Sequence, residues 1–151
     1  MKRTLTVVSV IIAASMFLAG VAMPTTADAQ SAAKDRVALM KLNGKNMGKI
    51  KKATDTQTIV EAAKVINANT KKLASADLWP AGSGGGETRA KMEIWQNMGD
   101  FKAKLKALED SSANLIKVSM GGDLGNSKKA FGAMAKNCGG CHKVYQVPKK
   151  R

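Results

Sequence analysis

The spacing of apolar residues constrains the fold of this chain more than any other feature. In four stretches, apolar side chains recur at alternating steps of three and four residues, the signature of a helix that buries one stripe. The longest stripe predicts a helix from about Thr88 to Met120. No stretch alternates in polarity with a period of two for long, so strands are not expected. The sequence therefore predicts an all-α chain.

The other three stripes predict helices from about Ala32 to Lys52, from about Thr58 to Ala76 and from about Asn126 to Gln146. Thr58 has the spacing to Glu61 that is typical of a capping box, so it is expected to begin the second helix. With short connections, four such helices form an antiparallel four-helix bundle.

Glycine and proline mark the ends of these helices. The stretch Trp79–Glu87 contains a proline and four glycines, so it is predicted to be a loop. Gly121 and Gly122 are predicted to end the third helix as a C-cap. The pattern shows no internal repeat, and the length allows one domain.

Residues 1–29 have the features of a secretory signal peptide. Two basic residues precede an uncharged, mostly apolar segment from Leu5 to Met23, and Ala27-Asp28-Ala29 matches the small-x-small cleavage pattern. Cleavage there would leave a mature domain of residues 30–151 in the periplasm. An uncleaved membrane anchor is the alternative, because about 20 apolar residues span a bilayer.

The formal net charge is +14, and loss of the signal peptide would lower it only by one. This charge favours acidic partner proteins or anionic membrane surfaces. Nucleic acid is not an expected partner, because the basic residues are not interleaved with aromatic ones. Aromatic residues make up only 4% of the chain, so a large apolar cofactor could supply part of the core.

Both cysteines and the only histidine stand together in Cys138-Gly139-Gly140-Cys141-His142. On a helix, the two thiols and the imidazole project from nearly one face. C-x-x-C-H is the pattern of covalent haem attachment, with two thioether bonds and the histidine as proximal iron ligand. The two glycines each cost about 1 kcal/mol in a helix interior. They are expected to let a flat ring lie close to the backbone.

Three other interpretations of these residues are weaker. A thioredoxin-like dithiol needs a βαβ context, which the pattern lacks. A structural zinc site needs four ligands, and no further cysteine or histidine exists. A disulfide suits an oxidising compartment but leaves His142 unexplained. No nucleophile–base constellation can be assigned, so no enzymatic activity is predicted.

With this motif at the C-terminal end of a predicted helical bundle, the chain resembles the cytochrome c-prime family, the class II c-type cytochromes. The other shared elements, in the family's order, are Arg36-x-x-x-Met40, Leu78-Trp79-Pro80, Glu93-Ile94-Trp95 followed by Phe101, and the run from Cys138 to Tyr145. Leu78-Trp79-Pro80 departs slightly, since phenylalanine is more usual before that proline.

The resemblance implies one haem c, attached through Cys138 and Cys141 and ligated by His142. It also implies that Met40 covers or binds the sixth iron position and that Arg36 lies near a haem propionate. For Arg36, a solvated helix charge is the alternative. Homodimers that pair through the first two helices also occur in the family.

Two functions follow from the ligation of the iron. A His/Met low-spin haem suits an electron carrier that meets acidic redox proteins or membrane complexes. A five-coordinate, high-spin haem would bind NO or CO. We expect Met40 to ligate, because Gly44, one turn later, would let the first helix approach the haem closely. A haem-free helical protein with a disulfide is the third hypothesis.

Overall fold

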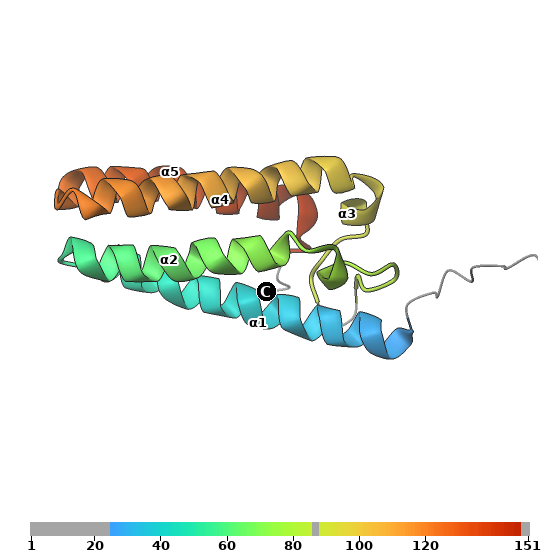
Figure 1. The fold of residues 1–151 in the computed structure, drawn as a ribbon. Coiled ribbons are helices and arrows are strands. Elements are labelled where there is room, and N and C mark those ends of the chain that lie inside the picture. The colour runs from blue at the N-terminus through green and yellow to red at the C-terminus, as the bar shows by residue number, and fades with distance from the viewer. Residues whose placement is uncertain (1–24, 86–87, 149–151) are drawn as a thin grey trace, which may run out of the picture.

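The computed structural model describes residues 25–85 and 88–148, and its long helices form two layers (Figure 1). In one layer α1 (Thr26–Lys52) lies beside α2 (Thr56–Leu73). In the other, α4 (Met98–Met120) lies beside α5 (Leu124–Tyr145), and α2 packs on α4 to join the layers. The predicted all-α class and four-helix bundle are confirmed.

The starts of the helices are set by side-chain caps. The capping box predicted at Thr58 is wrong, because α2 begins earlier, at Thr56. The carboxylate of Asp55 accepts the backbone N–H of Thr58 at 2.7 Å and so satisfies one of the free donors of the first turn. Asp123 caps α5 in the same way. An acidic cap also interacts favourably with the helix dipole.

The first turn of α1 uses residues that were assigned to the signal peptide. Thr25 and Asp28 form a reciprocal capping box at the start of the helix. Cleavage after Ala29 would remove this cap. The basic and apolar parts expected for the signal peptide lie in residues 1–24, outside the described residues. Among the described residues, no helix has the length and hydropathy needed to cross a membrane.

The third predicted helix, Thr88–Met120, is interrupted in the structure. Residues 88–92, before α3 (Glu93–Gln96), are not part of a helix, and Lys91 donates its backbone N–H to the carbonyl of Tyr145 at 3.0 Å. Asn97, with φ −128° and ψ 45°, separates α3 from α4. This pairing with the end of α5 is non-local, so the periodicity could not reveal it.

The connection after α2 is irregular, as predicted for Trp79–Glu87 in its described part. α2 ends at Leu73, three residues earlier than predicted, and the short 3₁₀ helix η1 (Ala76–Leu78) follows. The indole N–H of Trp79 donates to the carbonyl of Leu73 at 2.7 Å and satisfies one of the free acceptors at the end of α2. At the far end of α4, Gly122 has φ 82°, which confirms the predicted glycine C-cap.

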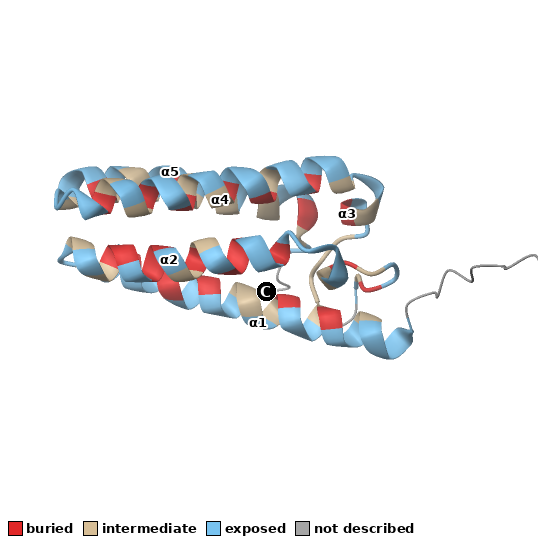
Figure 2. Ribbon diagram, viewed as in Figure 1, coloured by how far each residue is buried: buried red, intermediate tan, exposed pale blue. Residues whose placement is uncertain are grey.

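Buried residues line the inner faces of both layers (Figure 2). They divide into two groups, which we call the aliphatic cluster and the aromatic cluster. The aliphatic cluster comprises Ile50, Ile59, Ala62, Ala63, Ile66, Leu108, Leu115 and Met134. The aromatic cluster comprises Leu73, Trp79, Ile94, Phe101, Leu105 and Tyr145.

The buried face of α1 differs from the predicted apolar stripe. Arg36, Asn43 and Asn46 are buried, whereas Gly44 is exposed. A Cβ added at Gly44 would meet no atom within 4 Å. The packing around Gly44 therefore does not support the expectation that this glycine lets the first helix come close to the haem. Polar residues on the inner face of a helix are invisible to a search for apolar periodicity.

Candidate functional site

A cavity of about 410 Å³ is lined by residues of α1, α3, α4, the connecting loop and the end of α5. This volume is in the range of cofactor and ligand sites. Figure 1 shows α3, the connecting loop and the end of α5 at the same end of the bundle. Four members of the aromatic cluster form part of its wall. The lining residues are Arg36, Val37, Met40, Lys41, Trp79, Thr88, Arg89, Ala90, Ile94, Phe101, Cys141, His142, Tyr145 and Gln146.

Three residues of the C-x-x-C-H motif lie half-buried on the last turns of α5. Cys141 and His142 line the cavity, and Cys138 packs beside the aliphatic cluster. Both cysteines are free thiols. Their spacing of three residues on a helix places them on neighbouring positions of one face. The helix therefore presents two unpaired thiols and an imidazole near one cavity.

Burial shifts the pKa of each of these groups in the direction that favours the uncharged form of the group. Burial raises the pKa of the Cys138 thiol above its usual value, and it raises that of Cys141 to about 11. The pKa of His142 is lowered, first by burial and then by the positive charge of Arg89. At neutral pH the imidazole is thus held in the uncharged form, which is the form that ligates metals.

Met40 reaches the same cavity from the opposite layer. It stands on α1, is half-buried and packs against the aromatic cluster. Met40 and His142 therefore line one space from two helices that are far apart in sequence. Met47, two turns later on α1, packs against the aliphatic cluster and does not line the cavity.

Arg36 is buried, with 3% of its surface exposed, so it is not a solvated helix charge. Its guanidinium donates to the carbonyl of Leu78 and to both the carbonyl and the hydroxyl of Ser83. It also lies 4.5 Å from the ring centre of Trp79 and 5.9 Å from that of Trp95. These contacts fasten the connecting loop to α1. Its Nε–H is one of two buried side-chain groups that have no hydrogen-bond partner among the described residues, and the hydroxyl of Ser119 is the other.

Sequence reasoning missed a strap that crosses the end of α5. Ala90 and Gln146 form an antiparallel bridge, and Val147 donates its N–H to the carbonyl of Arg89 at 2.8 Å. This pairing brings Arg89 to the cavity wall beside His142. The sequence predicts a helix from Thr88, directly after the glycine-rich loop, and it gives no signal for the bridge because Gln146 lies more than fifty residues from Ala90.

The side chain of Tyr145 links the cavity to α4. Its hydroxyl donates to the carboxylate of Asp100 at 2.6 Å, and this bond raises the pKa of Tyr145 to about 12. Lys104 pairs with the same carboxylate at 3.7 Å. The ring of Tyr145 also packs edge-on against Phe101, with centroids 5.3 Å apart.

Gly139 and Gly140, between the cysteines, are exposed. A Cβ at either position would meet no atom within 4 Å. The expectation that they make room for a flat ring close to the backbone therefore has no support in their surroundings. Their exposure leaves a stretch of bare backbone on the outside of α5.

The residues around the cavity fit a covalently attached haem. Two free, half-buried thiols can each form a thioether bond, and a neutral imidazole beside them can ligate the iron. Met40, whose side chain carries a thioether sulfur, lines the same cavity. Aromatic and aliphatic side chains supply the rest of an apolar lining.

Comparison with known proteins gives the same result. The family model described as "Cytochrome C'" matches residues 31–146. A cytochrome c' from Alcaligenes xylosoxydans xylosoxydans is 31% identical over 80% of this chain and 96% of its own length. A cytochrome c-556 from Agrobacterium tumefaciens (strain B2A) is 32% identical over 76% and 95%.

A solved structure agrees with these sequence relatives. The cytochrome c prime from Shewanella frigidimarina superposes with a TM-score of 0.71 at 31% identity, over 80% of this chain and 97% of that one. The match thus covers the bundle, the motif and nearly the whole relative. The chain is a c-type haem protein and belongs to the cytochrome c' family.

Proposed function

We propose that this protein is an exported electron carrier with one haem c, attached through Cys138 and Cys141. His142 would be the proximal iron ligand and Met40 the distal one. When bound, the haem supplies a one-electron iron couple, and a His/Met ligand pair raises its potential. The observation that carries the proposal is that Met40 and His142 line the same cavity from α1 and α5.

The other cavity residues have supporting roles in this proposal. Phe101, Trp79 and Ile94 are almost fully buried, so they give this side of the cavity an apolar wall. Burial keeps His142 uncharged, and an uncharged imidazole offers a lone pair to iron. Arg36 fastens the connecting loop to α1, and its unpartnered Nε–H is the donor left for a propionate.

Export and assembly are part of the proposal. In the periplasmic protein, intact-mass analysis should give Gln30 as the first residue. A start at Met1 would instead support the membrane anchor. Homodimer formation stays a prediction, which sedimentation equilibrium of the haem-loaded protein checks. Acidic redox proteins remain the expected partners, given the net charge of +14.

Optical spectra of a pair of matched variants test the ligation. Met40→Leu removes the proposed ligand sulfur while nearly conserving volume, and Met47→Leu makes the same change on the same helix away from the cavity. We expect low-spin spectra and no rapid CO binding for the wild type and Met47→Leu. Met40→Leu should become high-spin and bind CO promptly.

Binding of NO or CO at a five-coordinate haem is the second candidate function. One observation favours this function: Gly44 is exposed and packs against nothing, so it gives no reason to expect Met40 to come close enough to the haem to ligate the iron. A half-buried Met40 beside Val37 would then act as an apolar cover over the binding position. A high-spin wild type that binds CO as fast as Met40→Leu would establish this function and contradict electron transfer through a His/Met haem.

A further inference from the structure

A groove of about 270 Å³ lies between α4 and α5, and exposed residues from both helices form its walls. Among the described residues, Cys141 alone lines both this groove and the cavity beside His142. The side chain of Cys141 thus separates the proposed haem site from the groove. The groove is lined by Asp100, Ala103, Lys104, Ala107, Lys136, Asn137, Gly140 and Cys141.

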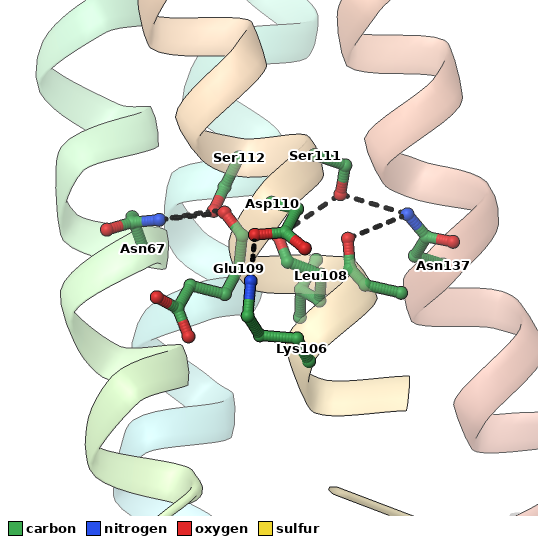
Figure 3. A network of polar contacts seen from close by, with 9 residues as sticks. Asn67, Lys106, Leu108, Glu109, Asp110, Ser111, Ser112 and Asn137 are labelled. Atoms are coloured by element: carbon green, nitrogen blue, oxygen red, sulfur yellow. Dashed lines mark hydrogen bonds and ion pairs between the residues drawn. The ribbon is translucent and has the colours of Figure 1, made fainter. Parts of the chain in front are cut away.

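Beside the groove, hydrogen bonds from α5 to α4 hold the two helices together. The side-chain amide of Asn137 donates to the carbonyl of Ala107 at 3.2 Å and to the hydroxyl of Ser111 at 2.9 Å (Figure 3). On the other side of α4, Asn67 bonds Ser112 from α2 at 2.9 Å. These bonds hold α4 between its two neighbours, so the groove is present before any partner binds.

The α5 wall of the groove is unusually bare next to Cys141. Gly140 is exposed and has no positive φ, and a Cβ there would meet open space. Nothing within the bundle requires glycine, although glycine costs about 1 kcal/mol in a helix interior. A bare backbone does allow another protein surface to come close to Cys141.

The charge of the groove is positive. Lys104 and Lys136 line it, and Asp100 is the single acidic residue there. The Asp100 carboxylate is already engaged by Lys104 and by the hydroxyl of Tyr145. Lys136 is exposed and has no acidic partner among the described residues, and Lys143 shares its face of α5. The complementary surface is therefore acidic.

We infer that this groove is the docking surface for an acidic one-electron redox protein, with Cys141 as the covalent link between the haem and the groove. The inference rests on the proposed function. A haem attached through Cys138 and Cys141 and ligated by His142 would accept one electron from the reduced partner; no bond would form or break and no proton would move. A concave groove suits a protruding acidic loop better than it suits a flat lipid surface.

The test measures reduction of the haem-loaded protein by a reduced, acidic plant-type [2Fe–2S] ferredoxin in stopped flow. Lys136→Glu and Gly140→Glu place negative charge in the groove. Their matched controls are Lys129→Glu and Gly132→Glu, which make the same changes at exposed positions nearer the N-terminus of α5, outside the groove. At low ionic strength the groove variants should react roughly fivefold or more slowly, and the controls within about twofold of wild type. Added salt should reduce the difference in reduction rate between the groove variants and the wild type, because it screens the charges.

Equal losses in all four variants would overturn the inference, because net charge alone would then steer the encounter. Binding to phosphatidylserine vesicles that only the groove variants lose, with unchanged ferredoxin rates, would overturn it in favour of a membrane. Optical spectra of the same samples report the iron ligation. A high-spin wild type would therefore disprove the proposed function separately from the position of docking.

Discussion

In the described part of the connecting loop, the guanidinium of Arg36 provides the side-chain hydrogen bonds that tie the loop to α1. It makes three hydrogen bonds to Leu78 and Ser83 and lies against Trp79. Hydrogen bonds to a charged group contribute about 1.5–3 kcal/mol each when they are buried. A lysine ammonium cannot reproduce the planar fork of donors that these acceptors require.

We therefore expect Arg36→Lys to lower the free energy of unfolding by about 2–4 kcal/mol, measured by urea denaturation of the haem-loaded protein. Arg89→Lys is the matched control. Arg89 is half-exposed, and its guanidinium makes one 3.3 Å hydrogen bond to the carbonyl of Val147. Arg89→Lys should therefore change the free energy of unfolding by no more than about 0.5 kcal/mol. Equal stability of both variants, with a changed reduction potential only for Arg36→Lys, would make Arg36 a propionate ligand rather than a clamp.

The Tyr145–Asp100 hydrogen bond makes stability depend on alkaline pH. The folded protein holds the phenolic proton more tightly than the unfolded chain, because the pKa rises from 10.0 to about 12. The stabilisation is complete below pH 10 and is lost as the pH rises from 10 to 12. Between these values the wild type should lose more stability than Tyr145→Phe, whose side chain does not titrate.

Tyr145 is the only tyrosine, so ultraviolet absorbance of phenolate follows this residue alone. Urea unfolding at both ends of the pH range supplies the free energies, and Tyr145→Phe corrects for the lysines that titrate there. An ordinary phenolic pKa near 10 in the folded protein would contradict the hydrogen bond.

At the residue scale, the sequence predicts which side chains lie together when those residues are close neighbours along the chain. Cys138, Cys141 and His142 are within one turn of a helix, so their shared placement needs only the helical period. Arg36 was expected to act on a cofactor, and its observed partners lie more than forty residues away. Contacts at such separation depend on the fold and leave no periodic signal.

At the scale of elements, α1 and α2 are joined by a buried pair of amides. The amide of Asn69 donates to the side-chain carbonyl of Asn43 at 2.9 Å. Both residues are more than nine-tenths buried, at 4% and 8% exposure. Replacing one of the two asparagines leaves the other amide buried without a hydrogen-bond partner, which lowers stability by about 1–3 kcal/mol. Replacing both with apolar residues can leave stability nearly unchanged.

A double-mutant cycle tests this pair. Asn69→Leu and Asn43→Leu should each destabilise the protein by about 1–3 kcal/mol in urea unfolding, and the double variant should recover most of the loss. Additive losses in the double variant would show that the two amides do not stabilise one another across the α1–α2 interface.

The elements that were predicted correctly are those with a long local signal. The α4 stripe of Phe101, Leu105, Leu108 and Leu115 is buried as expected, and α5 matches within two residues at each end. The prediction failed at residues 88–92 and at Asn97, whereas Glu93–Gln96 is helical as predicted. At residues 88–92, pairing with the end of α5 overrides the helical preference of the segment.

At the scale of the molecule, the two core clusters differ in their contact with the cavity. Trp79, Ile94, Phe101 and Tyr145 of the aromatic cluster line the cavity, whereas no member of the aliphatic cluster does. A cavity of about 410 Å³ deprives its walls of packing partners. The half of the bundle around the cavity should therefore be the part that haem stabilises.

Haem-free protein tests this division. In Cys138→Ser/Cys141→Ser, purified without haem, amide hydrogen exchange should rise roughly tenfold or more around Trp79 and in α3, a loss of about 1.4 kcal/mol or more in local stability. Amides around Ile59, Ile66 and Leu115 should keep most of their protection, because their packing does not involve the cavity. The haem-loaded wild type provides the reference. A uniform loss of protection along α1, α2, α4 and α5 would mean that the bundle opens as one cooperative unit, so that the haem stabilises both clusters equally.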